Sequence, residues 1–201
     1  MEQKKSSERL VFFTDAVVAI ALTLLILPLT ELVPELVAEH KPALEVVTGN
    51  WSKIFSFVLS FVVIGRFWSV HHTIFEHVRA YSTALMRANF CWLLTIAVLP
   101  FPTELIGAYQ TERFTVVFYL GTLLARSLCH TARVLIVRRD PQVRGDAEPM
   151  SDESFWSFAV STAVFALAVV VALIKPGFGY YVLLLLAVPS TIVRRVLSAG
   201  K

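Results

Sequence analysis

Charged residues are scarce in this sequence. Only 16% of its 201 residues are Asp, Glu, Lys or Arg, whereas 56% are apolar, and the mean hydropathy is +0.68. A soluble domain has about a quarter of its residues charged, so this composition excludes an ordinary soluble globular protein. The excess of 18 basic over 15 acidic residues is small, and orientation in a membrane explains it better than binding to nucleic acid.

Cysteines are few, and the motifs of common enzymes are absent. Cys91 and Cys129 lie in apolar stretches without a CxxC or Cys/His ligand spacing, which argues against a disulfide framework and a zinc site. The sequence has no GxSxG, HExxH, P-loop or GxGxxG pattern, so the usual catalytic and nucleotide-binding constellations are missing. We therefore expect no enzymatic activity, no metal site and no cofactor.

What the sequence does contain is a series of long apolar runs. A helix needs about 20 apolar residues to cross a bilayer, and six runs approach this length, at 10–29, 54–75, 85–108, 114–137, 155–174 and 178–193. They are continuously apolar rather than alternating, which favours helices over barrel strands. The first run is too long for the core of a signal peptide and contains Asp15, so we interpret it as a retained helix. We predict an all-α membrane protein with six transmembrane helices in a single domain over residues 1–201.

Basic residues are distributed unevenly among the connections between these runs. Twelve of the 18 lie near the termini and in the second and fourth connections, a count that assigns Arg133 to the fourth connection. Four lie on the opposite side, where the connection 31–53 is acidic. The positive-inside rule therefore places both termini in the cytoplasm. Arg66 and Arg126 lie within apolar runs, where we expect them to be counter-ions inside the bundle.

The first run separates its polar and apolar residues onto different faces. At about 100° per residue, one stripe follows the length of this helix and contains Phe13, Ile20, Leu24, Leu27 and Glu31. Thr23 lies at the flank of the stripe, whereas Thr14 and Asp15 point away from it. Such a stripe is typical of core or lipid packing, and its periodicity alone does not identify a pore.

Further polar residues lie within the apolar runs, among them His71, His72, Asn89 and His130. A charged residue at the centre of a membrane helix costs ~2.5–3.5 kcal/mol on insertion scales, so polar groups at this depth need partners inside the bundle. The adjacent His71 and His72 cannot chelate one ion from the same helical face. Buried, hydrogen-bonded histidines are the simpler interpretation, and metal or haem ligation is the alternative.

Three separated patterns resemble one known family. Residues 9–25, RLVFFTDAVVAIALTLL, resemble the R-x-x-x-F-S-D-x-x-x-A-I-x-x-T-L-L signature of the transmembrane protein 175 potassium channel family, whose prokaryotic members have one six-helix repeat. The run WSVHH at 68–72 is similar to the W-x-x-H-H pattern of that family's second helix. Asn89, followed by LPFPT at 99–103, is similar to the pattern of its third helix. The resemblance covers about residues 9–110, and the last three helices agree only in hydropathy.

The resemblance implies a homotetramer in which the first helices surround a central pore for K⁺ in a prokaryotic plasma membrane. Ile20, Leu24 and Leu27 would form hydrophobic rings that constrict or gate this pore, and Thr23 would supply a hydroxyl layer for K⁺ preference. The family's structural polar network would comprise Arg9, Thr14, Asp15, Trp68, His71, His72 and Asn89.

The sequence departs from the family pattern in three places. Thr14 stands where Ser is usual and keeps the hydroxyl group, and Ala16 stands where Gly is common. Pro28 occupies a position associated with an acidic residue at the outer mouth, and Glu31, one turn later on the stripe, is the candidate to replace it. Two other functions remain open from the residues. One is a membrane cytochrome with His71 or His72 and His130 as haem ligands, and the other is an ion-coupled secondary transporter built around Asp15 and the histidines.

Overall fold

The computed structural model describes residues 7–109, 112–147, 151–183 and 185, which form helices joined by short connections. The helices are α1 (Glu8–Leu24), α2 (Leu27–Ala38), α3 (Ala43–Thr48), α4 (Trp51–Phe75), α5 (Thr83–Val98), α6 (Pro100–Tyr109), α7 (Arg113–Arg139), α8 (Pro141–Arg144), α9 (Asp152–Ile174) and α10 (Pro176–Val182). The prediction of an all-α protein is confirmed.

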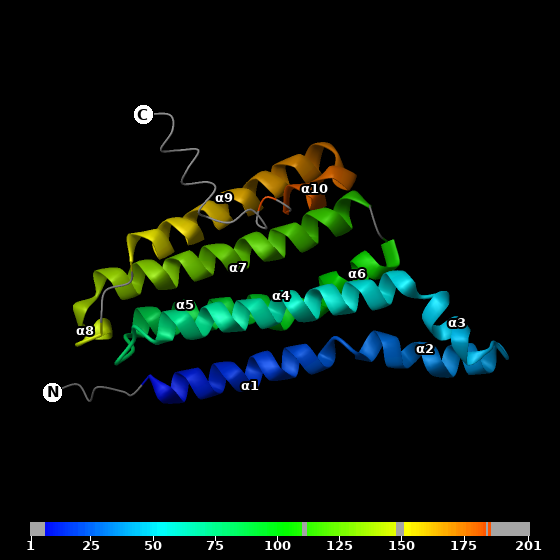
Figure 1. Cartoon of the computed structure of the whole chain (residues 1–201), viewed down its shortest axis with the longest axis horizontal. Coiled ribbons are helices and arrows are strands. Elements are labelled where there is room, and N and C mark those ends of the chain that lie inside the picture. Colours follow the sequence, from blue (N-terminus) through cyan, green and yellow to red (C-terminus); the bar gives the residue numbers. More distant parts are fainter. Residues whose placement is uncertain (1–6, 110–111, 148–150, 184, 186–201) are drawn as a thin grey trace.

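The long helices lie side by side as an elongated bundle (Figure 1). Helices α1 and α2 form one edge, α9 and α10 form the other, and α4, α5, α6 and α7 lie between them. Helix α1 contacts α4 and α5, whereas α7 contacts α5, α6 and α9. The start of α1, the connection 76–82 and α8 gather at one end of the bundle, and α3 lies at the other end.

Five segments are long and apolar enough to cross a membrane: Glu8–Ala38, Trp51–Phe75, Thr83–Tyr109, Arg113–Arg139 and Phe155–Ile174. They coincide with the first five predicted runs, so the chain is a multi-pass membrane protein. The sixth predicted run, 178–193, begins within α10. Its residues 184 and 186–193 lie outside the part that the structure describes.

The first span is longer than predicted. Pro28 is the second residue of α2, a position where the missing N–H leaves no hydrogen bond unmade within the helix. The chain therefore continues as a helix to Ala38, although Pro34 removes one internal bond. Leu32 and Leu36, one turn apart, are buried against the bundle and offset this loss. Most of the predicted connection 31–53 is itself helical, because α2, α3 and the start of α4 cover it.

The exposed connection that remains between α2 and α3 holds a small ion cluster. Lys41 Nζ lies 3.0 Å from a Glu39 carboxylate oxygen and 3.3 Å from one of Glu45. The hydrogen bonds and charges of these two acids raise the pKa of Lys41. The positive charge of Lys41 in turn neutralises part of the acidic character that the sequence assigns to this end of the bundle.

Candidate pore helix and its polar network

One face of α1 packs into the bundle. It consists of residues three or four positions apart, namely Leu10, Thr14, Val18, Ala21 and, directly after the helix, Leu25. This spacing is that of a single helical stripe. Val18, Ala21 and Leu25 belong to the main apolar core, together with side chains of α4, α5, α7 and α9. Burial of this stripe fixes α1 at the edge of the bundle.

The opposite face of α1 is exposed. Ile20 is 58% exposed, Leu24 42% and Leu27, at the start of α2, 48%. Thr23 is also exposed, and its hydroxyl donates to the carbonyl oxygen of Ile20 at 2.8 Å. Glu31 lies exposed further along the same segment. The structure thus brings the predicted stripe together on the surface of the subunit, where so large an apolar patch must contact lipid or another chain.

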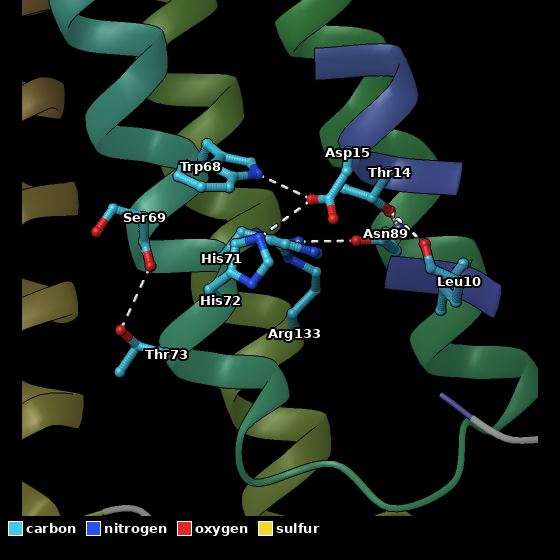
Figure 2. A network of polar contacts seen from close by, with 10 residues as sticks. All are labelled: Leu10, Thr14, Asp15, Trp68, Ser69, His71, His72, Thr73, Asn89 and Arg133. Atoms are coloured by element: carbon cyan, nitrogen blue, oxygen red, sulfur yellow. Dashed lines mark hydrogen bonds and ion pairs between the residues drawn. The ribbon is translucent and has the colours of Figure 1, made fainter. Parts of the chain in front are cut away.

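Asp15 lies at the border between these two faces and joins α1 to α4. Its carboxylate oxygen Oδ1 accepts a 2.8 Å hydrogen bond from Trp68 Nε1 and lies 3.1 Å from His72 Nε2 (Figure 2). The Trp68 and His72 rings meet edge to face, with centroids 4.6 Å apart. The Asp15 side chain is 32% exposed, so the bundle encloses this group only in part.

A second, fully buried chain of hydrogen bonds joins α1 to α5 and α7. Thr14 Oγ1 donates to the Leu10 carbonyl oxygen at 2.7 Å and accepts from Asn89 Nδ2 at 2.8 Å. Asn89 Oδ1 in turn accepts from Arg133 at 2.8 Å (Figure 2). The side chains of Thr14, Asn89 and Arg133 have no exposed surface. In a dry interior such bonds are strong, and leaving one unmade is costly.

Arg133 is the centre of this buried chain. Its guanidinium bonds His71 Nδ1 on α4 at 2.8 Å and His130 Nδ1 at 3.1 Å, and it lies 4.2 Å from the centre of the Trp92 ring. No carboxylate bonds Arg133 within the described ranges. Because arginine only donates, both Nδ1 atoms must accept, which leaves the proton of each neutral ring on Nε2.

The buried polar residues form a layer between two apolar clusters. In each of the helices α1, α4, α5 and α7, a buried polar residue lies between a side chain of the main core and a side chain of a smaller apolar cluster. This smaller cluster lies nearer the end of the bundle where α1 begins. In α4, for example, His71 lies between Phe67 and Ile74, and in α5 Asn89 lies between Leu85 and Trp92. The buried polar residues therefore form one layer across helices α1, α4, α5 and α7.

The prediction for Arg133 is wrong. Helix α7 continues to Arg139, so Arg133 lies inside the fourth span and not in the connection after it. The basic residues at that end of the bundle still outnumber those at the other end. A pattern that points to its burial is present in the sequence, since Arg126, His130 and Arg133 lie four and three residues apart and share one helical face.

Two further expectations for basic residues are not met. Arg9 is exposed and bonds none of the network residues in the described part of the chain. Arg126 is buried, but its guanidinium lies 3.5 Å from the centre of the Phe67 ring, with no carboxylate bonded to it among the described residues. Arg66 is exposed. Aromatic rings thus take the place of the expected acids beside the buried arginines.

The geometry does not favour the haem alternative. His71 and His130 bond the same guanidinium through Nδ1, so they do not face each other across a space for a macrocycle. His72 bonds Asp15 instead. The histidines of the spans therefore act as hydrogen-bond partners within the scaffold.

Comparison with known proteins identifies relatives. Residues 9–100 match the family described as endosomal/lysosomal potassium channel TMEM175. A potassium channel of Streptomyces collinus is 38% identical over 107 residues, which are 53% of this chain and 50% of that protein. The match thus spans about half the length of that relative. A potassium channel of Chryseobacterium sp. is 24% identical over 196 residues, 94% of this chain and 97% of that protein.

A solved structure shares the fold. The crystal structure of a lysosomal potassium-selective channel TMEM175 homolog from Chamaesiphon minutus superimposes with a TM-score of 0.73 and 23% sequence identity. The superposition covers 92% of this chain and 96% of that one. The arrangement of helices described above is therefore the arrangement of that channel's subunit.

Proposed function

We propose that this chain, whose residues 9–100 match the family described as endosomal/lysosomal potassium channel TMEM175, is a membrane channel that conducts K⁺ passively and in preference to Na⁺. One observation carries the proposal: the apolar stripe of α1 is exposed, while the opposite face is anchored in the bundle by packing and hydrogen bonds. We propose K⁺ as the permeant ion, and we propose no enzymatic activity and no cofactor.

In this proposal four copies of the chain surround a central axis, and α1 of each copy faces that axis. Ile20, Leu24 and Leu27 then form successive apolar rings. An ion sheds water at such a ring without receiving replacement ligands, so the ring opposes conduction when it is narrow and dry. A small rotation of α1 would widen and wet the ring, which makes it a gate.

Thr23 is the proposed origin of the K⁺ preference. Its hydroxyl proton is directed to the Ile20 carbonyl oxygen, so the lone pairs of the hydroxyl oxygen remain available to a cation. A ring of four hydroxyl oxygens replaces part of the hydration shell of K⁺. It is a weaker set of ligands than stacked rings of carbonyl groups, so we expect moderate discrimination.

Charge at the two ends of the bundle completes the proposal. Glu31 lies exposed beyond Leu27, where four copies would form an acidic ring that attracts cations to the outer mouth. Both termini are cytoplasmic in this arrangement, as the excess of basic residues at the other end requires under the positive-inside rule.

Flux measurements with purified protein in liposomes test the proposal. We expect the unmodified protein to pass K⁺ faster than Na⁺, without saturation at low concentration and without coupling to a proton gradient. Ile20→Asn should raise the flux of both ions, and Thr23→Ala should reduce the preference for K⁺. Val170→Asn is the matched control, because Val170 is 52% exposed on α9 at the opposite edge of the bundle. If Ile20→Asn and Thr23→Ala leave flux and preference unchanged, the constriction is elsewhere.

A further inference from the structure

Arg133 connects the helices that surround the buried end of α1. It extends from α7 and bonds Asn89 of α5 (Figure 2) and His71 of α4, each at 2.8 Å. It also covers the Trp92 ring of α5. The side chain is completely buried. Among the described residues Arg133 makes no hydrogen bond to α1, so its hydrogen-bonded connection to that helix passes through Asn89.

The hydrogen-bond chain from Arg133 to α1 has only one possible direction. A guanidinium has donors and no acceptor, so it must meet the oxygen of the Asn89 amide. The amide nitrogen then faces Thr14 and donates a hydrogen bond to its hydroxyl oxygen. The Thr14 hydroxyl in turn donates a hydrogen bond to the Leu10 carbonyl oxygen. Arg133 therefore determines the orientation of each group up to the backbone of α1.

Directional bonds are what set the rotation of a helix about its own axis. The packing of Val18 and Ala21 holds α1 near the bundle, but apolar contact is not directional, whereas hydrogen bonds weaken steeply when they bend. Thr14 and Ile20 lie about 120° apart around α1, at about 100° per residue. A fixed position of Thr14 thus fixes the direction in which Ile20 points.

We propose that Arg133 is a positioning residue for the pore: through Asn89 and Thr14 it sets the rotation of α1 and so the direction of Ile20 and Thr23. This inference rests on the proposed channel function. It assigns a role in ion preference to a residue of α7, whereas the proposed pore stripe lies on α1 and the start of α2.

Arg126 provides a matched control on the same helix. It lies two turns from Arg133 on the same face of α7, is also buried, and also covers an aromatic ring, that of Phe67. It has no hydrogen bond to α1 or to Asn89 within the described residues. Loss of Arg126 therefore removes a comparable side chain without disturbing the chain of bonds to Thr14.

The experiment compares Arg133→Met, Arg133→Lys, Thr14→Val and Arg126→Met in liposomes. Each is made with Cys91→Ala, Cys129→Ala and Ile20→Cys, so that the rate at which external Ag⁺ blocks K⁺ flux reports the direction of position 20. The K⁺/Na⁺ flux ratio is measured in the same variants without Ile20→Cys. Thermal unfolding in detergent is recorded for all of them.

We expect Arg133→Met and Thr14→Val to lose the preference for K⁺ and to change the rate of block by Ag⁺. Arg133→Lys, which keeps a donor for Asn89, should retain part of the preference for K⁺ that Arg133→Met loses. Arg126→Met should lower the unfolding temperature and keep both the flux ratio and the rate of block.

Two results would overturn the inference. One is a lower unfolding temperature of Arg133→Met with the flux ratio and rate of block of the unmodified protein, which would make Arg133 merely structural. The other is an equal loss of preference in Arg126→Met. If Arg133→Met does not fold, Thr14→Val decides, because it deletes one hydroxyl and nearly preserves shape. A protein without any K⁺ flux would instead refute the proposed function itself.

Discussion

The two faces of α1 are held in place by different interactions. On the buried face Thr14 has no exposed surface and Val18 is 2% exposed, and hydrogen bonds tie this face to α5. On the other face Ile20 is 58% exposed, and its neighbours on the stripe are apolar. The buried face thus combines apolar side chains with a hydrogen-bonded Thr14, whereas the exposed face is largely apolar, unlike the surface of a helix in a soluble protein. Apolar packing and directional hydrogen bonds therefore act together on the inward face of this helix.

The buried face also shows how polar residues can specify a membrane bundle. The interior offers no water to replace a lost bond, so a helix rotated by one position would leave Asn89 and Thr14 unpaired. Burial of a charge such as Arg133 is not in itself stabilising. Its advantage lies in selecting one arrangement of the four helices among others that bury similar apolar area.

The largest effect on stability is expected at the middle of the buried chain. Asn89→Leu removes two hydrogen bonds and leaves Arg133 with one partner fewer in a dry interior, so the free energy of unfolding should fall by about 3 kcal/mol. Denaturant unfolding in detergent measures it. Thr95→Val is the control on the same helix, because the Thr95 hydroxyl bonds only the carbonyl of Trp92. A loss for Asn89→Leu no greater than that of the control would show that the chain contributes little.

A smaller effect is expected at the border of the two faces. Asp15→Ala removes the bonds from Trp68 and His72, but the side chain is 32% exposed, so we expect a loss of about 1 kcal/mol. Because Trp68→Phe removes one of the same bonds, the double variant should lose less than the sum of the two. Purified Asp15→Ala protein with unchanged thermal stability would refute the structural role of Asp15.

On the exposed stripe we expect almost no effect on the fold of the subunit. Ile20→Asn should change the free energy of unfolding by less than about 0.5 kcal/mol, as is usual for surface positions, while it raises K⁺ flux. The free energy of unfolding and the K⁺ flux are measured on the same preparation of Ile20→Asn. A loss of stability as large as that of Asn89→Leu would mean that the stripe packs within the subunit and would remove the distinction between the two faces.

The smallest effect is expected at Glu31. Glu31→Gln should leave stability unchanged and reduce K⁺ flux only at low ionic strength, because salt screens the attraction of an exposed acidic ring. Glu112→Gln, at the exposed start of α7 away from α1, is the control. An equal reduction in both variants, or one that persists at high salt, would contradict a specific role of Glu31 at the mouth.

The sequence predicts the fold well where hydropathy alone decides. The first five spans lie where the apolar runs predict them, because the cost of exposing backbone to lipid leaves few alternatives. The errors of the prediction from sequence have physical causes. The predicted run ends at residue 29, directly after Pro28, yet Pro28 is the second residue of α2, and buried Leu32 and Leu36 carry that helix past Pro34.

The candidate site was predictable in part. The pattern in α1 and α4 places Asp15, Trp68 and His72 in one network, and the structure joins them. Arg133 was missed because a basic residue near the end of an apolar run is ordinarily counted with the adjoining connection. The shared helical face of Arg126, His130 and Arg133 points to burial, but the partners of Arg133 on α4 and α5 depend on contacts between distant segments that periodicity does not encode.

The central claim is that the exposed stripe of α1 lines the path of K⁺. Block of K⁺ flux by Ag⁺ tests it most directly, in protein that carries Cys91→Ala and Cys129→Ala together with Ile20→Cys, Leu27→Cys or Val170→Cys. We expect Ag⁺ to stop the K⁺ flux through Ile20→Cys and Leu27→Cys and to leave the flux through Val170→Cys unaffected. Unchanged K⁺ flux through Ile20→Cys and Leu27→Cys in the presence of Ag⁺ would contradict it.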